Sequence, residues 1–167
     1  YLINKTISSL KDGDILMYLD CGCEIDVRNK EKIKQFFEIV KTDYISGCLT
    51  TCHLPEKGWC KMDLLLRLNI FDETILNTQQ RQAGAQLIYI CDKTRKLMSE
   101  WYSIVSSDYH MIDDSKSHAP NYPEFKEHRH DQSTFSLLTK KYGLFSSHYI
   151  TKCIKYDRNK TGTSKLR

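Results

Sequence analysis

The stretch Asp14-Ile15-Leu16-Met17-Tyr18-Leu19-Asp20-Cys21-Gly22-Cys23-Glu24 decides the fold that we expect for this chain. Its run 15–19 is apolar on both faces and bounded by turn residues, which is typical of a fully buried strand in the middle of a parallel sheet. Asp20 follows the strand directly. Ligands bind beyond the carboxyl ends of strands in open α/β sheets, so an acid beside a glycine can hold a divalent metal there. The alternative, which this stretch alone favours, is that Asp20 only caps a turn.

Strands and helices alternate along the rest of the chain. Apolar residues at helical spacing predict helices over 30–41, 59–68, 93–106 and 131–142, and residues 1–10 resemble the end of another amphipathic helix. Apolar runs predict short strands over 44–51 and 85–91. This alternation indicates an α/β fold, with strands 15–19 and 87–90 in one mixed, mainly parallel sheet that is covered by helices 30–41 and 93–106.

Length and composition indicate one soluble globular domain. The chain has 167 residues, of which 40% are hydrophobic and 28% charged. We assign residues 1–150 to the domain and 151–167 to a basic tail, where much of the net charge of +4 lies. We expect a solvated tail and no nucleic-acid partner. No apolar run is long enough to span a membrane.

The cysteines favour free thiols in a reducing compartment. There are seven of them, with no Cys-x-x-Cys pair. A zinc site can be drawn from Cys48, Cys52, His53 and Cys60, but its spacing matches no standard pattern.

The polar cluster Glu127-His128-Arg129-His130-Asp131-Gln132-Ser133 precedes an apolar helix and follows the aperiodic connection 108–130. We expect Asp131 to be the N-cap of that helix. This leaves the two imidazoles and the arginine unexplained. Imidazole can bind a metal or phosphate, the guanidinium matches a diphosphate, and a helix N-terminus attracts anions. A solvated, charged turn is an equally good interpretation of these residues alone.

Two weaker signals lie between these stretches. The small residues Ala83 and Gly84, just before the second buried strand, allow a ligand to approach the backbone. Trp59 lies among charged residues at an expected helix start. An exposed tryptophan there can stack on a sugar, although a core tryptophan is commoner.

Taken together, these segments resemble nucleotide-sugar glycosyltransferases of the GT-A fold, which is Rossmann-like. The resemblance is strongest to the group that includes glycosyltransferase domains of large algal viruses, which build capsid glycans. It extends from the start of the chain to about Leu138 and is carried, in order, by Tyr18-Leu19-Asp20-Cys21-Gly22-Cys23-Glu24, Trp59-Cys60-Lys61, Gln82-Ala83-Gly84, Glu100-Trp101 and His128-Arg129-His130-Asp131-Gln132-Ser133.

The resemblance implies an enzyme that moves a sugar from a nucleotide-diphosphate donor to a glycan or other hydroxyl acceptor. In this family an Asp-x-Asp motif binds Mn²⁺ or Mg²⁺, and through it the donor diphosphate. Asp131 would be the catalytic residue, as a base if configuration inverts or as a stabiliser of positive charge if it is retained. The implied binding residues are Asp20 and His130 for the metal, Gly22, Gln82, Ala83, Gly84, His128, Arg129 and Gln132 for the donor, and Trp59 and Lys61 for the acceptor. The expected location is cytoplasmic, for example in a virus-infected host cell.

Two features depart from the family pattern. Asp20-Cys21-Gly22 lacks the second acid of the motif, although Glu24 could supply an oxygen. The family also places a nucleotide-binding βαβ segment before the motif, so the fold is expected to be N-terminally incomplete. Both departures favour the alternative of a non-catalytic carbohydrate-binding or structural remnant. A metal-dependent phosphodiesterase or nuclease is a third reading, but its paired metal carboxylates are not evident.

The glycosyltransferase reading makes one geometric demand on the fold. One metal-bound diphosphate has to touch both Asp20 and the cluster 128–131, so both must face one cleft. We expect the connection 108–127 to border that cleft and to close over the donor.

Overall fold

The computed structural model describes residues 1–50, 53 and 55–156, without the side chains of 151, 152 and 156, and all statements below refer to these residues. Cys52 of the zinc alternative and positions 157–167 of the expected tail therefore lie outside the described residues. None of the described helices is long and apolar enough to cross a membrane.

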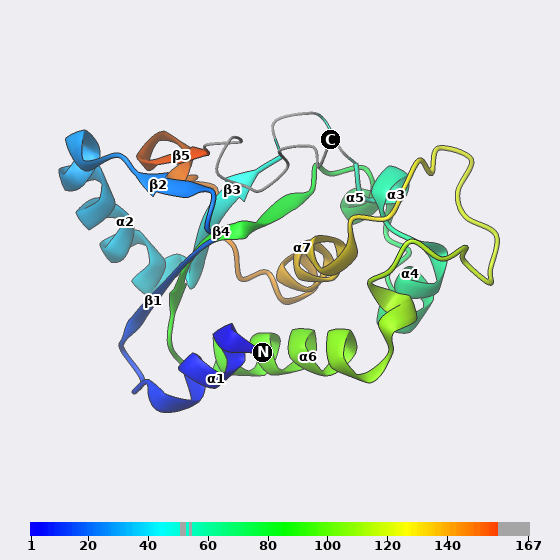
Figure 1. Ribbon diagram of the computed structural model, residues 1–167, viewed down its shortest axis with the longest axis horizontal. Helices are drawn as coiled ribbons and strands as arrows, with labels where there is room; N and C mark the ends of the chain where they lie inside the picture. The colour runs from blue at the N-terminus through cyan, green and yellow to red at the C-terminus, as the bar shows by residue number, and fades with distance from the viewer. Residues whose placement is uncertain (51–52, 54, 157–167) are drawn as a thin grey trace, which may run out of the picture.

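Helices and short strands alternate along the chain (Figure 1). The helices are α1 (Leu2–Ser9), α2 (Lys30–Asp43), α3 (Glu56–Trp59), α4 (Met62–Leu68), α5 (Glu73–Leu76), α6 (Asp92–Ser107) and α7 (His130–Tyr142). The strands are β1 (Ile15–Leu19), β2 (Cys23–Ile25), β3 (Ile45–Leu49), β4 (Arg81–Tyr89) and β5 (Ile154–Tyr156). Three 3-10 turns complete them: η1 (Val27–Asn29), η2 (Tyr109–Met111) and η3 (Ile150–Cys153).

The main sheet has the order β1-β4-β3, and both of its pairings are antiparallel. The predicted mixture of helix and strand is confirmed, whereas a mainly parallel sheet is not found. β1 is an edge strand among the described residues, and all five of its residues are half-buried instead of fully buried. An apolar run indicates burial but not direction. The direction of β4 relative to β3 is set by the intervening helices α3 to α5. They return the chain to the end of the sheet where β3 finishes, so β4 runs antiparallel to β3.

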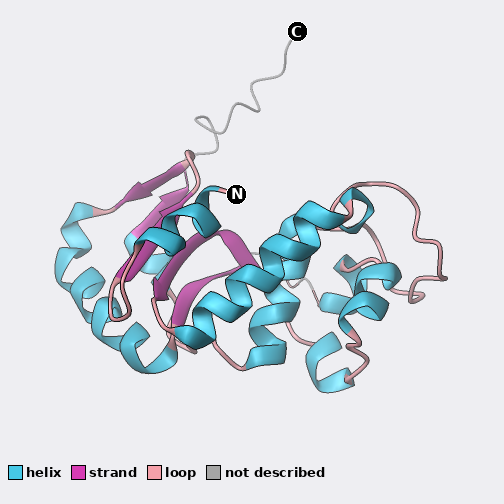
Figure 2. Cartoon of the chain, turned by 90° about the horizontal axis from the view of Figure 1, so that it is seen from below, coloured by secondary structure: helices cyan, strands magenta, loops and turns pink. Residues whose placement is uncertain are grey.

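Helices cover both faces of this sheet (Figures 1 and 2). Side chains alternate between the faces of β4, because successive residues of a strand point in opposite directions. Ala85 and Leu87 pack with Val40 of α2, whereas Ile88 and Ile90 belong to the larger core that includes residues of α6 and α7. The predicted covering by helix 30–41 is therefore confirmed, whereas on the other face α7 packs directly against β4 and the helix predicted over 93–106, α6, packs against α7. A separate ribbon pairs β2 with β5.

Three boundaries differ from the sequence prediction in ways that affect the site. The helix expected over 59–68 is broken between α3 and α4, because the backbone N–H of Lys61 donates to His128 Nδ1 (3.1 Å) instead of continuing a helix. β4 starts at Arg81, so residues 82–84 lie within the strand. Arg129, not Asp131, occupies the N-cap position of α7, and Asp131 lies in the first turn.

Candidate functional site

Asp20 leaves the end of β1 and lies against β4. Its backbone N–H donates to the carbonyl oxygen of Gly84 (2.8 Å), and its carboxylate Oδ1 accepts a hydrogen bond from the Tyr18 hydroxyl (2.8 Å). The other oxygen, Oδ2, occupies the space that a side chain at position 84 would need, since a Cβ placed there would be 2.3 Å away. Glycine at position 84 is therefore what lets the carboxylate rest on the strand.

Asp131 lies in the first turn of α7, close enough to Asp20 for the two charges to interact. The indole N–H of Trp101 donates to its backbone carbonyl (3.1 Å) and fixes the start of the helix. The residue as a whole is exposed. Desolvation, and then the negative charge of Asp20, raise the pKa of Asp131. The structure thus brings Asp20 and Asp131 together, although they are far apart in sequence.

Tyr18 completes this group and connects it to a cavity. Desolvation, its hydrogen bond to Asp20 and the charges of Asp20 and Asp131 raise the pKa of Tyr18 to about 12. Tyr18 and Asp131 line a cavity of about 290 Å³ between α1 and α6. Its other walls are mainly aromatic and aliphatic: Tyr1, Leu2, Ile3, Asn4, Met98, Trp101, Tyr102 and Val105.

Three further expected donor-binding residues lie next to these in the chain. Gly22 is buried in the turn after β1, which is closed by a hydrogen bond from Cys23 N–H to Asp20 O (2.8 Å). Gln82 is half-buried on β4. Ala83 is buried in the core, and its carbonyl accepts from the Gln86 side chain (2.7 Å). These residues shape the strand ends around Asp20.

His128 has a structural role in this fold. It is buried, its Nδ1 accepts from the Lys61 N–H, and its Nε2 is 2.9 Å from the carbonyl oxygen of Met111. Desolvation lowers the pKa of His128 to about 4, so the ring is neutral at pH 7. Both ring nitrogens are engaged with the backbone. The donor contact expected for His128 would require one of these hydrogen bonds to break.

The other residues of the cluster point to different partners. Arg129 stacks over the ring of Trp59, with its guanidinium carbon 4.8 Å from the ring centroid, so one face of the expected acceptor-stacking ring is occupied. Gln132 donates to the side-chain oxygen of Gln80 (2.9 Å). His130 has a φ of +52° and lies 2.8 Å from Asp114 Oδ1. The side-chain contact of His130 is thus with Asp114 of the connection 108–127, and Asp20 as a metal partner of His130 stays a prediction.

Lys61 does not have the expected place at an acceptor surface. Only 1% of the residue is exposed, and its ammonium donates to His110 O (2.8 Å), Asp113 Oδ1 (2.9 Å) and Ser115 Oγ (3.4 Å). Both ionic and hydrogen-bonding partners come from the connection after α6. Lys61 thus anchors that connection to the body of the protein.

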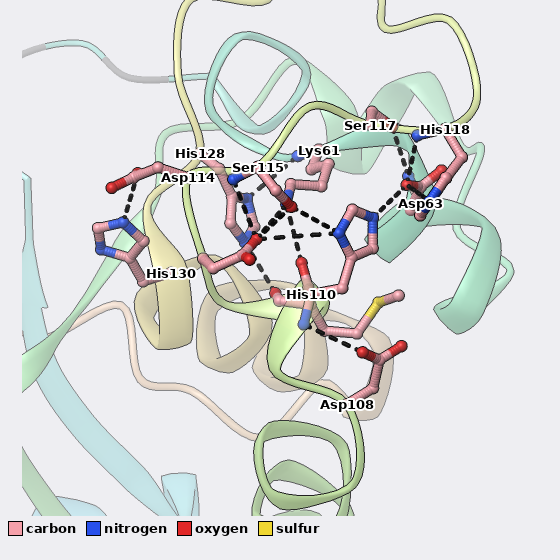
Figure 3. A network of polar contacts seen from close by, with 12 residues as sticks. Lys61, Asp63, Asp108, His110, Asp114, Ser115, Ser117, His118, His128 and His130 are labelled. Atoms are coloured by element: carbon pink, nitrogen blue, oxygen red, sulfur yellow. Dashed lines mark hydrogen bonds and ion pairs between the residues drawn. The ribbon is translucent and has the colours of Figure 1, made fainter.

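The connection 108–127 is held against α4 by hydrogen bonds to Lys61 and Asp63 (Figure 3). It lines a second cavity, of about 520 Å³, together with Lys61 and His128. This cavity shares no lining residue with the one beside Asp131. The prediction that the connection borders the cleft of Asp20 and Asp131 is therefore not supported, because Lys61 and Asp63 hold it elsewhere.

Beside the second cavity, the fold gathers Asp63, His110 and His118, none of which the sequence indicated as a site (Figure 3). Burial alone would raise the pKa of Asp63, but hydrogen bonds from His110 and from the backbone N–H groups of His118 and Ala119 hold it well below its usual range. These residues come from α4, η2 and the connection, so their spacing in sequence carries no recognisable pattern.

No protein family model, curated protein or solved structure matches this chain. Its function has to be inferred from the chemistry of the residues that the fold brings together.

Proposed function

We propose that this chain is part of a metal-dependent glycosyltransferase of the GT-A type, which moves a sugar from a nucleotide-diphosphate donor to a hydroxyl acceptor. The observation that carries the proposal is the meeting of Asp20, Gly84 and Asp131 beside a cavity with aromatic walls. The resemblance of the sequence required Asp20 and Asp131 to face one site. Nothing in their local sequences requires it.

The sheet is compatible with the proposed fold. An antiparallel β4 beside the acid-bearing strand β1 would belong to a mixed sheet whose parallel strands lie on the other side of β1. Among the described residues that side of β1 has no strand partner.

The oxygen atoms at this site suit a hard divalent cation such as Mn²⁺ or Mg²⁺. Asp20 is exposed, so its carboxylate can exchange the Tyr18 hydroxyl for a metal. Mg²⁺ typically keeps several waters and needs one or two protein carboxylates together with substrate phosphates. A motif that has lost its second acid can therefore still hold it. The metal would neutralise charge on the diphosphate leaving group.

Asp131 has the environment of a general base. A carboxylate with a raised pKa holds a proton more firmly than an ordinary aspartate, which favours proton transfer from an acceptor hydroxyl. In an inverting reaction Asp131 would take that proton. In a retaining reaction its charge would stabilise the oxocarbenium-like sugar. In both cases its contribution belongs to the transition state, not to donor binding.

The cavity beside Asp131 is the proposed place of the sugar. Tyr18, Trp101 and Tyr102 supply rings whose flat faces suit the apolar side of a pyranose, and the Tyr18 hydroxyl supplies a polar contact. The same walls would also serve a protein that binds carbohydrate without transferring it. The absence of a second acid at Cys21-Gly22 favours that second candidate, and the assay below separates the two.

The test is transfer and hydrolysis of a panel of nucleotide sugars with Mn²⁺, together with calorimetric donor binding. We expect Asp20→Ala to abolish metal-dependent donor binding, because the metal loses a charged oxygen ligand. We expect Asp131→Asn to keep donor binding within about threefold and to lower transfer by about 10²- to 10⁴-fold.

Asp92→Asn is the matched control, because Asp92 is exposed at the start of α6, beyond the opposite end of β4, and should change neither quantity. Glycan binding with no turnover of any donor would establish the carbohydrate-binding alternative. Transfer by Asp131→Asn at the wild-type rate would remove the proposed role of that residue.

A further inference from the structure

We propose that Asp63, His110 and His118 form a binding site for a divalent transition metal of the Zn²⁺ class, separate from the proposed Mn²⁺ or Mg²⁺ site at Asp20. The ligand atoms are Asp63 Oδ2, His110 Nε2 and His118 Nδ1, and all three lie within 4.8 Å of one another. This inference does not depend on the proposed transferase activity.

The three ligand atoms already converge. Asp63 Oδ2 lies 2.6 Å from His110 Nε2 and 3.1 Å from His118 Nδ1, and the two imidazole rings have centroids 4.4 Å apart. Ligands on one tetrahedral Zn²⁺ at about 2.0–2.1 Å from the metal are separated by a little over 3 Å. The His110 ring would have to withdraw from Asp63 Oδ2 by a fraction of an ångström, and the metal would share that oxygen with the His118 backbone N–H (2.7 Å). The side chain of His118 is 83% exposed and can move freely into place.

A second layer of hydrogen bonds orients the cluster as in protein metal sites. His110 Nδ1 lies 2.7 Å from Ser115 Oγ. The Ser115 hydroxyl donates to Asp113 Oδ1 (2.6 Å), and the same oxygen accepts a hydrogen bond from the Lys61 ammonium. A metal-binding histidine usually donates its other N–H to such a partner, which fixes the tautomer and the ring direction. With Nδ1–H donating to Ser115, the His110 Nε2 lone pair would face the metal.

The ligand set selects the class of metal. Two imidazoles and one carboxylate suit Zn²⁺ and its neighbours in the first transition series, whereas Mg²⁺ and Mn²⁺ prefer oxygen ligands. A tetrahedral ion with three protein ligands has a fourth coordination position. Water can reach that position, because His118 is exposed to solvent.

A metal at this point would join three segments that are distant in the chain. Asp63 belongs to α4, His110 to η2 and His118 to the connection that lines the second cavity. The ion would therefore fasten the connection to α4 beside the buried Lys61, and it would restrict opening of that cavity.

The test is titration of the reduced chain with Zn²⁺ by calorimetry, with Co²⁺ as a spectroscopic probe. We expect one equivalent of Zn²⁺ to bind, with d–d absorption of Co²⁺ and without thiolate charge-transfer bands, since no cysteine is a ligand. His118→Ala should weaken binding by at least about 100-fold, more than removal of an outer hydrogen bond does. Because His118 is exposed, this variant should remain folded.

Two controls identify the site. His148→Ala removes an exposed histidine elsewhere and Asp20→Ala removes the proposed oxygen-ligand site, and both should bind Zn²⁺ like the wild type. Zn²⁺ should also slow proteolysis within residues 112–127 in the wild type and not in His118→Ala. Failure of the wild type to bind Zn²⁺, or unchanged binding by His118→Ala, would overturn the proposal.

Discussion

Gly84 and Gly47 both lie on the main sheet, and other atoms fill the space where each would carry a side chain. At Gly84 the obstacle is the carboxylate of Asp20, an exposed side chain that can rotate away. At Gly47 it is the backbone carbonyl of Ala85, 2.9 Å from a built Cβ, and the ring of Phe145, at 3.1 Å. The first contact is displaced by moving a side chain, whereas the second requires the sheet itself to shift.

Alanine should therefore have a different effect at each of these two glycines: at position 84 it should weaken donor binding, and at position 47 it should lower stability. We expect Gly84→Ala to weaken Mn²⁺-dependent donor binding by about 10-fold or more, because Asp20 loses its place, while the free energy of unfolding changes by less than about 1 kcal/mol. Gly47→Ala should cost about 1–3 kcal/mol of stability through overpacking. Calorimetric donor binding and urea unfolding measure both. Equal loss of stability in the two variants would contradict this reading.

His128 should make the stability of the protein depend on pH. The folded protein resists protonation of the buried ring, whereas the unfolded chain accepts a proton near pH 6.5. The stability due to neutral His128 is thus complete above about pH 6.5 and is lost as the pH falls toward 4. The difference between the ordinary pKa of 6.5 and about 4 corresponds to about 3 kcal/mol.

The variant His128→Gln isolates this effect, because glutamine offers a donor and an acceptor but does not titrate. Urea unfolding at pH 7 and pH 4.5 gives the measurement. We expect the variant to be less stable than the wild type at pH 7 and to approach it at pH 4.5. A constant difference between the two proteins at both pH values would show that His128 does not titrate as described.

At the scale of elements, a buried ion pair joins α3 to α7. Glu56 is fully buried, and its carboxylate contacts the Lys140 ammonium, the Ser136 hydroxyl, the Cys60 thiol and the Gln80 side-chain amide. Desolvation lowers the pKa of Lys140, and the nearby Glu56 charge opposes that change. The pair matters because either charge without the other would be buried alone.

We expect Lys140→Met to destabilise the protein by about 3–5 kcal/mol, since it leaves the Glu56 carboxylate unpaired in the core. The double variant Glu56→Gln with Lys140→Met should lose less than the sum of the two single variants. Urea unfolding of all four proteins completes the cycle. Additive losses would mean that the two charges do not stabilise each other.

Which elements could be predicted from sequence depends on how local their causes are. The helices around 30–41, 93–106 and 131–142 follow from an apolar stripe within each segment, and the structure contains α2, α6 and α7 there. The antiparallel direction of β4 and the break at Lys61 depend on partners far along the chain, so no local pattern indicates them.

The two candidate sites also depend on partners that are distant in the chain, which local sequence patterns do not indicate. A resemblance that spans distant segments places Asp20 and Asp131 at one site, and in the structure the charge of Asp20 acts on Asp131. The contact of His130 with Asp114 has no local signal, because Asp114 comes from the connection. The cluster at Asp63 was missed for the same reason. Each of its residues is unremarkable within its own segment, and only the folded connection brings them together.

At the scale of the whole molecule, the free side of β1 is open to pairing. The hydrogen bonds between Asp20 and Gly84 and between Ile90 and Asp14 direct the even-numbered residues toward β4. The N–H groups of Ile15, Met17 and Leu19 therefore point to the other side, where no strand of the described part pairs with them. Open strand edges promote association between copies.

We expect the purified chain to associate reversibly as its concentration rises, and Met17→Pro to reduce this association. Proline is tolerated on an edge strand where its missing N–H would face outward. Sedimentation at several concentrations measures the effect, and circular dichroism checks the fold. Leu66→Ser, which removes an exposed apolar side chain on α4, is the control and should associate like the wild type. A wild-type chain that stays monomeric throughout would refute the expectation.

The central position of β4 also has a consequence for the order in which the molecule forms. β4 carries Gly84, β1 comes from near the start of the chain with Asp20, and α7 comes from near its end with Asp131. Contacts between such distant segments form slowly compared with single helices. A refolding chain would thus regain helical circular dichroism before these three residues meet. Chains caught part-way would therefore have their helices but not yet the proposed site at Asp20, Gly84 and Asp131.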